Sequence, residues 1–422
     1  MGPLRAAEAR RASRGPPSTT PSRRYSNHTM TTQNAAPVEP GDRIEFLDVL
    51  RGVALLGILM VNLPFLGLPL SEAASPPGLA SGGADAWTGA IVRALAENKF
   101  MGLFSLLFGM GLALQVDRAE ARGVSARSFY PRRLAVLAVF GVLNGTMIFF
   151  GDILLPYAVA GTVLFLLRRR APRTMLWVAA LFLLVGISLS VLFEGVFVTD
   201  SGGGADERGL DRALAEGTFL EGTVARGQIY AVWLLLSSII AFNWRILALF
   251  LVGAAVMRLG WTRPDARALH RRLAAIGLTA GLTLEGASLL LHASEDATVG
   301  IRILDVLMHQ VGGLCLSAGY AGAVAVWCSS SLAARVRRGL AATGRMALTN
   351  YLGQNVVAGL IFYGHGAGRL GDFSRVELVG LGVLIFGSQV VLSTLWMARA
   401  RGGPMELLWR RLTYPRRGST EG

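Results

Sequence analysis

Asp305 and His309 lie four residues apart within one apolar run, and their types and spacing are those of a general base. On a helix this spacing places both side chains on one face. A carboxylate one turn from an imidazole can orient the ring and raise its basicity, which suits deprotonation of a hydroxyl or amine acceptor. The same spacing also suits a structural pair, so both interpretations stay open at this point.

Asp48 and Arg51 form a second pair of charged residues, three apart near the start of the first long apolar run. They can form an ion pair on one helix face, and Arg51 is a candidate for binding an anionic substrate group. Asn62 follows in the same run, where an amide either polarises a carbonyl or joins two helices. A structural ion pair near the membrane surface is the alternative.

Lys99 is the only lysine among the 41 basic residues. An ammonium kept at one position indicates a need for a compact or tunable charge, and the alternative is a side chain that extends to the membrane surface. Asp152 lies in the tight hairpin Phe150-Gly151-Asp152-Ile153. It either binds substrate or caps the helix that follows.

Residues 344–355 lie in a predicted span but include many polar side chains, among them Asn350, Tyr351 and further amides. These side chains cannot all face lipid, so they either line a polar cavity or join helices. Glu285 stands alone in another apolar run, where a carboxylate must be paired or protonated. No cysteine, histidine or carboxylate spacing indicates a metal site.

Composition shows which elements must position these residues. Of 422 residues, 52% are hydrophobic and 16% are charged, whereas soluble domains have about a quarter charged residues. The formal net charge is +14, and the arginines flank apolar runs instead of forming one patch. This pattern excludes a soluble enzyme and a nucleic-acid-binding protein, and it predicts a membrane protein whose arginines face the cytoplasm and contact anionic lipids.

The apolar runs predict an all-α polytopic membrane protein with about ten transmembrane helices. Arginine-rich loops alternate with acidic or arginine-poor ones, which places both termini in the cytoplasm. The predicted spans are residues 47–66, 100–117, 133–150, 153–167, 175–198, 245–260, 272–292, 303–328, 345–363 and 376–398. Residues 229–242 form either a re-entrant helix or part of a longer span.

Three segments follow from this count. Residues 1–43 form a basic, disordered tail, in which Met30 is an alternative start. Residues 44–398 form the transmembrane domain with an acidic outer loop at 199–226, and 399–422 form a basic amphipathic cytoplasmic tail. We expect Trp409 to anchor that tail at the membrane surface.

Several of these runs resemble a known family. LDVLRGVALLGILMVN, KFMGLFSLLFGMGL, GDILLPYAVAG, GRMALTNYLGQ and GPMELLWRRLTY are similar to segments of the bacterial YeiB family, also called domain of unknown function 418. Asp48, Arg51, Gly52 and Asn62 also resemble the start of membrane acyltransferases that acetylate heparan glucosamine. The resemblance implies a bacterial inner (plasma) membrane location and transfer of an acyl group, with acyl-CoA as donor, to a membrane or cell-envelope acceptor. Asn144 stands where family members commonly have His.

Three functions follow from the residues and this resemblance. The first is a membrane acyltransferase, with Asp305 and His309 as catalytic base and with Arg51, Asp48, Asn62, Lys99, Asp152, Asn350 and Tyr351 around the substrate. The second is a proton-coupled transporter or flippase of a small or lipid-like anion, which would use the buried ionisable residues. The third is a non-catalytic membrane scaffold.

Overall fold

Six helices in the described chain are long and apolar enough to cross a membrane, which indicates a membrane protein as the composition predicted. They are Glu45–Gly67, Gly83–Ala121, Pro172–Gly195, Arg267–His292, Val299–Cys328 and Arg375–Met397. A bent pair, Phe219–Ser237 and Phe242–Arg258, meets the same test if its two arms form one span, which gives up to seven. The two arms differ in direction by 65°.

The computed structural model describes residues 45–74, 79, 82–197, 205–239, 242–262, 266–294 and 297–414. Its regular elements in these ranges are helices, which confirms the all-α class. The first eight α-helices are α1 (Glu45–Gly67), α2 (Leu70–Ala74), α3 (Gly83–Leu95), α4 (Lys99–Ala121), α5 (Tyr130–Met147), α6 (Leu154–Leu167), α7 (Pro172–Ser190) and α8 (Ala205–Ala215). They are followed by α9 (Phe219–Ile239), α10 (Phe242–Arg258), α11 (Arg267–His292), α12 (Val299–Cys328), α13 (Ala334–Arg345), α14 (Ala347–Phe362), α15 (Arg375–Met397) and α16 (Pro404–Thr413).

The predicted count of about ten spans is not confirmed. The predicted spans at 153–167 and 345–363 correspond to α6 and α14, with 14 and 16 residues. At 1.5 Å per residue they are about 21 and 24 Å long, shorter than the ~30 Å hydrocarbon core. Of residues 229–242, which the sequence left open, the described ones form the end of α9 and the first residue of α10, and these two helices differ in direction by 65°.

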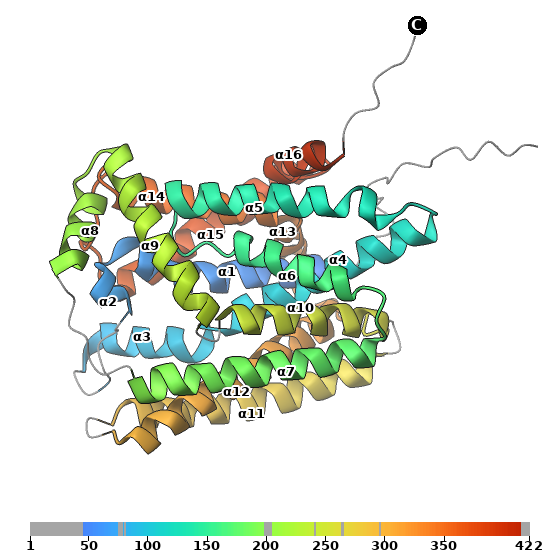
Figure 1. Ribbon diagram of the computed structural model, residues 1–422, viewed down its shortest axis with the longest axis horizontal. Helices are drawn as coiled ribbons and strands as arrows, with labels where there is room; N and C mark the ends of the chain where they lie inside the picture. The colour runs from blue at the N-terminus through green and yellow to red at the C-terminus, as the bar shows by residue number, and fades with distance from the viewer. Residues whose placement is uncertain are drawn as a thin grey trace, which may run out of the picture.

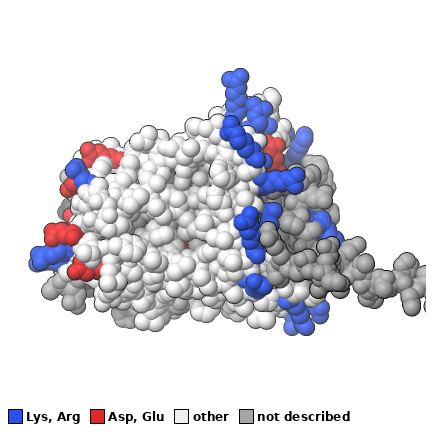
Figure 2. Space-filling model, turned by 90° about the horizontal axis from the view of Figure 1, so that it is seen from above, with Lys and Arg blue, Asp and Glu red and all other residues white. Residues whose placement is uncertain are grey.

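Most of the long helices run along the long axis of the molecule, whereas α9 crosses it obliquely; α7, α11 and α12 lie on one side, and α5, α13 and α16 lie toward the other (Figure 1). On the face shown in Figure 2, Lys and Arg gather at one end and most Asp and Glu at the other, with an uncharged band between them. We call the first of these the arginine-rich end. Such a band between two charged ends is the surface that a bilayer would cover.

The two ends of the described chain lie at the arginine-rich end. Glu45, the first residue of α1, forms an ion pair with Arg337 at 3.1 Å, and α16 lies at the same side of the molecule (Figure 1). The predicted tail at 1–43 lies outside the described residues. The predicted outer loop, 199–226, contains α8 and the start of α9, and Asp211 of α8 accepts a hydrogen bond from the Leu70 amide at 3.0 Å.

Glycines allow two close helix contacts that position the polar residues. In the α11–α12 hairpin, a Cβ on Gly277 or Gly322 would lie 2.6 Å from backbone of the facing helix. Where α1 crosses α13, a Cβ on Gly344 would lie 1.8 Å from the Asp48 carbonyl oxygen. Small residues at such positions let helix backbones approach closely in a membrane, where dispersion contacts drive packing.

Candidate functional site

A cavity of about 280 Å³ opens near the arginine-rich end; we call it the arginine cavity. Arg118 and Phe104 both line it from α4, so it extends along about 21 Å of that helix at 1.5 Å per residue. Residues of α1, α5, α14 and α16, together with the end of α13 and the start of α6, complete the wall. The helix contact at Gly344 places the end of α13 beside Asp48, and so builds one corner of the cavity.

Four arginines line this cavity: Arg51, Arg118, Arg133 and Arg345. Each is half-buried. The predicted ion pair forms, with Arg51 Nη1 2.8 Å from Asp48 Oδ1. The buried Nε atoms of Arg133 and Arg345 have no hydrogen-bond partner among the described residues. Asp48 and Glu406 are the carboxylates in the lining, so positive charge is in excess and the cavity favours an anion.

The C-terminal helix α16 forms one wall of the arginine cavity. Trp409 is buried, its Nε1 donates to the Arg133 carbonyl at 3.0 Å, and the Arg133 guanidinium stacks 3.6 Å from its ring centroid. The expected membrane anchor is therefore a contact with α5 in the structure. The reason is that the indole finds both a carbonyl acceptor and a cation within the protein.

Glu406 of α16 caps the start of α14. Its Oε1 accepts hydrogen bonds from the amides of Leu348 at 2.7 Å and Thr349 at 3.1 Å. These amides have no partner within their own helix, so a carboxylate from another helix satisfies them. Burial raises the pKa of Glu406, while the hydrogen bonds that it accepts act in the opposite direction.

The deep end of the arginine cavity is apolar and lies beside Asp152. Phe104, Ile153 and Leu154 line it, together with the buried Tyr351. Asp152 is fully buried, and its Oδ2 accepts hydrogen bonds from the amides of Leu154 at 2.8 Å and Leu155 at 3.1 Å. The capping role considered for Asp152 is thus present. Asn144 Nδ2 donates a hydrogen bond to Oδ1 at 2.8 Å, so Asn144 contacts Asp152 directly.

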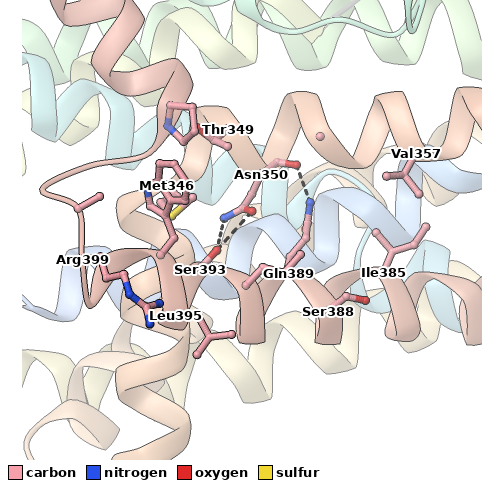
Figure 3. Close-up of a pocket in the computed structure, with 15 residues that line it drawn as sticks. Met346, Thr349, Asn350, Val357, Ile385, Ser388, Gln389, Ser393, Leu395 and Arg399 are labelled. Carbon is pink, nitrogen blue, oxygen red and sulfur yellow. Dashed lines mark hydrogen bonds between the residues drawn. The ribbon is translucent and has the colours of Figure 1, made fainter.

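Asn350 does not line the arginine cavity; it lines a different groove, between α14 and α15 (Figure 3). Its Nδ2 donates to Ser393 Oγ at 2.9 Å and to the Thr343 carbonyl at 3.0 Å. Gln389 donates to the Asn350 carbonyl at 2.8 Å. Asn350 therefore joins α13, α14 and α15, and Tyr351, its neighbour in sequence, faces the cavity.

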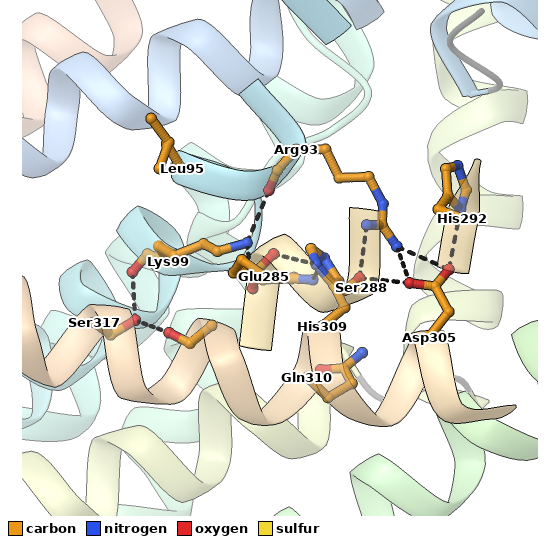
Figure 4. Close-up of polar contacts among 12 residues, drawn as sticks. Arg93, Leu95, Lys99, Glu285, Ser288, His292, Asp305, His309, Gln310 and Ser317 are labelled. Carbon is orange, nitrogen blue, oxygen red and sulfur yellow. Dashed lines mark hydrogen bonds and ion pairs between the residues drawn. The ribbon is translucent and has the colours of Figure 1, made fainter. Parts of the chain in front are cut away.

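A second cluster of polar residues is largely buried and lies between α3, α4, α11 and α12; we call it the buried network (Figure 4). Glu285 is its centre, with Lys99 Nζ 2.8 Å from Oε1 and His309 Nδ1 3.0 Å from Oε2. The side chains of Lys99 and Glu285 are 0% and 1% exposed. Nε2 of His309 lies 3.2 Å from Nδ2 of Asn98, which can donate to it.

Arg93 links this centre to a second carboxylate nearer the surface. Its carbonyl accepts a hydrogen bond from Lys99 at 2.8 Å, and its Nη2 lies 3.0 Å from Asp305 Oδ1. Asp305 also accepts from Ser288 and lies 3.0 Å from Nδ1 of His292, whose side chain is 47% exposed. The network therefore connects the surface with a buried ion pair (Figure 4).

The predicted pairing of Asp305 with His309 does not form. The carboxylate beside His309 is Glu285, and Asp305 instead binds Arg93, Ser288 and His292. Spacing along α12 predicted one shared face, but the close α11–α12 contact supplies different partners from the facing helix.

The sequence-predicted residues do not meet in one place. Asp48, Arg51 and Tyr351 line the arginine cavity, whereas Lys99, Asp305 and His309 belong to the buried network. Phe104 and Lys99 are five positions apart on α4, about 140° around the helix, so α4 presents a different face to each region. Asn62 lies about 16 Å along α1 from Arg51 and does not line the cavity.

Sequence reasoning missed most of the residues that contact the predicted ones. Arg118, Arg133 and Arg345 were interpreted only as charges at the ends of spans, and nothing in their spacing separates the two roles. The role of Asn98 can be recognised only in the structure, where its φ of 64° marks the break between α3 and α4. That left-handed conformation, which Asn adopts more readily than most residues, directs the chain so that Asn98 reaches His309.

The comparisons with known proteins agree on one family. Residues 256–416 match the family described as protein of unknown function (DUF418). The chain is 30% identical over 400 residues to the uncharacterised protein YxaH of Bacillus subtilis, covering 90% of this chain and 96% of YxaH. It is 31% identical over 376 residues to the uncharacterised protein YeiB of Escherichia coli, covering 87% of this chain and 95% of YeiB. With this identity over nearly the full length of both relatives, the chain belongs to the YeiB-like DUF418 family.

Proposed function

We propose that this protein is a membrane acyltransferase that takes its acyl group from a phosphate-bearing donor of the acyl-CoA type. The observation that carries the proposal is the arginine cavity, which combines four half-buried guanidinium groups with an apolar deep end. The Asp48, Arg51 and Asn62 pattern, which is similar to that of membrane acyltransferases, points in the same direction.

The chemistry of the cavity fits the two ends of such a donor. Guanidinium groups bind phosphate oxygens through paired hydrogen bonds, and four of them line this cavity. The phosphates of the donor would lie among the arginines, and the acyl-bearing arm would extend along α4 toward Phe104 and Tyr351. The arginine-rich end would face the cytoplasm, where acyl-CoA is available.

In the acyl-transfer step, an acceptor hydroxyl or amine attacks the thioester carbonyl carbon. The new bond joins the acceptor oxygen or nitrogen to the acyl carbon, the carbon–sulfur bond breaks, and the proton lost by the acceptor ends on the departing thiolate. We assign Tyr351 to donating a hydrogen bond to the carbonyl oxygen, because its side chain lies in the wall at the deep end. Asp305 and His309, the base expected from the sequence, belong to the buried network and do not line this cavity, so we assign them no part in this step.

Label transfer tests this proposal. Purified protein is incubated with acetyl-CoA labelled in the acetyl group and with an extract of bacterial membranes and cell envelope. We expect label in a lipid or envelope product, and we expect Tyr351→Phe to slow transfer at least tenfold without weakening donor binding. Donor binding with no labelled product from any extract would contradict acyl transfer.

The buried network favours a second candidate, proton-coupled transport of an anion. A chain of ionisable groups from the exposed His292 to the buried Lys99 and Glu285 is the arrangement that proton relays in membranes use. Uptake of a labelled anion into vesicles, driven by a pH gradient and lost in His309→Gln, would support this function. A scaffold without either activity would show neither label transfer nor uptake.

A further inference from the structure

A second hollow lies between α14 and α15 (Figure 3), and it is larger than the arginine cavity. Its volume is about 730 Å³. Val357, Ile385, Leu392 and Leu395 supply apolar surface, and the last two side chains are 64% and 55% exposed. We call it the α14–α15 groove.

One end of the groove has the residues typical of a membrane surface. Arg399 follows the last turn of the candidate span α15, is exposed, and lines the groove. Trp396 lies one turn before it, and its indole Nε1 donates to the Gly402 carbonyl at 3.0 Å. Tryptophan and arginine at the end of a span mark the level of the lipid headgroups.

The rest of the groove lies along the part of α15 that would be inside the bilayer. From Arg399 to Ile385 the lining extends about 21 Å at 1.5 Å per residue, which exceeds the ~15 Å of hydrocarbon in one leaflet. Gln389 and Ser393 of α15 both form hydrogen bonds with Asn350 of α14, and Gln389 Oε1 is the floor atom without a partner among the described residues. A hydrocarbon chain could therefore cover the floor without displacing their hydrogen bonds.

We propose that the α14–α15 groove binds one anionic phospholipid from the leaflet at the arginine-rich end. The phosphate lies at Arg399, and one acyl chain runs along α15 over Gly353, where a Cβ would find only Gln389 within 4 Å, at 3.8 Å. A hollow on a lipid-facing surface is filled by lipid, since water there would lack partners. Charge selects the lipid, because arginine at the membrane surface attracts anionic headgroups. This site is independent of the proposed acyl transfer.

Native mass spectrometry of the detergent-purified chain tests the headgroup contact. Phosphatidylglycerol or the zwitterionic phosphatidylcholine is added to the lipid-depleted protein, and the lipid-bound fraction is measured. We expect one tightly held phosphatidylglycerol and about fivefold weaker retention in Arg399→Gln. Arg401→Gln removes the same charge from an exposed position two residues away that does not line the groove, and it should bind like the unmodified protein.

Two glycine variants test the acyl-chain path. Gly353→Leu would fill the groove and should lower retention of either lipid at least tenfold. Gly387→Leu is the matched control, because Gly387 lies on α15 outside the groove and a Cβ there meets nothing within 4 Å. Equal lipid retention by Arg399→Gln and Arg401→Gln would overturn the proposal, and so would equal retention of the two lipids. Detection of the chain as a dimer without bound lipid would also overturn it.

Discussion

The arginine cavity and the buried network are both rich in charged residues, but they differ in how fully those charges are paired. In the cavity, four guanidinium groups face two carboxylates, and two buried Nε atoms lack a partner among the described residues. In the network, Lys99 and His309 share the carboxylate of Glu285, and Arg93, Ser288 and His292 surround Asp305.

We interpret this difference as one between a candidate ligand site and a cluster whose charges are paired within the protein. Cations left under-neutralised beside an open cavity favour an incoming anion, whereas paired charges in a largely buried region mainly fix the positions of their helices. The two regions should therefore respond differently to mutation: changes in the network should affect folding, and changes in the cavity should affect binding.

The largest effect is expected at the centre of the network. Glu285→Leu would leave the buried ammonium of Lys99 without its carboxylate, at a cost of about 3–5 kcal/mol in unfolding free energy. Thermal unfolding in detergent, followed by circular dichroism, measures the loss. The double variant Lys99→Met/Glu285→Leu is the control, because removing both charges should restore most of the stability. A single variant as stable as the unmodified protein would show that Lys99 does not depend on Glu285.

The next effect is expected where α1 crosses α13 at the edge of the cavity. Gly344→Ala would place a methyl group 1.8 Å from the Asp48 carbonyl oxygen, so the helices must separate, at a cost of about 1–3 kcal/mol. The same unfolding measurement applies. Gly380→Ala is the matched control, since a Cβ there meets nothing within 4 Å. Equal stability of the two variants would contradict the close contact that builds this corner of the cavity.

A smaller effect is expected from the cap between α16 and α14. Glu406→Ala removes the acceptor of the Leu348 and Thr349 amides, and the loss of such a cap costs about 1 kcal/mol. Limited proteolysis should also cut near α16 faster, because this helix loses one of its contacts. Unchanged proteolysis and stability would mean that Trp409 alone holds α16 in place.

Sequence reasoning predicted those features that depend on neighbours along one helix. The Asp48–Arg51 ion pair and the Asp152 cap were both among the alternatives considered, and both are present because their partners lie within a few residues. The all-α class followed from the apolar runs along the chain, and the family resemblance followed from short sequence motifs.

Features that depend on contacts between helices could not be predicted in this way. His309 forms a hydrogen bond with Glu285 because glycines allow α11 and α12 to approach closely. The spacing of residues along α12 alone does not predict that contact. The predicted count of about ten spans is not confirmed, because an apolar run such as 153–167 forms a helix, α6, of only 14 residues. In the sequence, the arginines of the cavity cannot be distinguished from other arginines at the ends of spans. Only the packing of α13 and α16 shows that they line one cavity.

Calorimetric titration of the purified protein with coenzyme A tests the central claim, that the arginine cavity binds a phosphate-bearing anion. Arg345→Gln is compared with Arg338→Gln, which removes the same charge from an exposed position on α13 outside the cavity. We predict that coenzyme A binds, that Arg345→Gln weakens binding at least tenfold, and that Arg338→Gln binds like the unmodified protein. Absence of binding at millimolar coenzyme A, or equal weakening by the two variants, would contradict the claim.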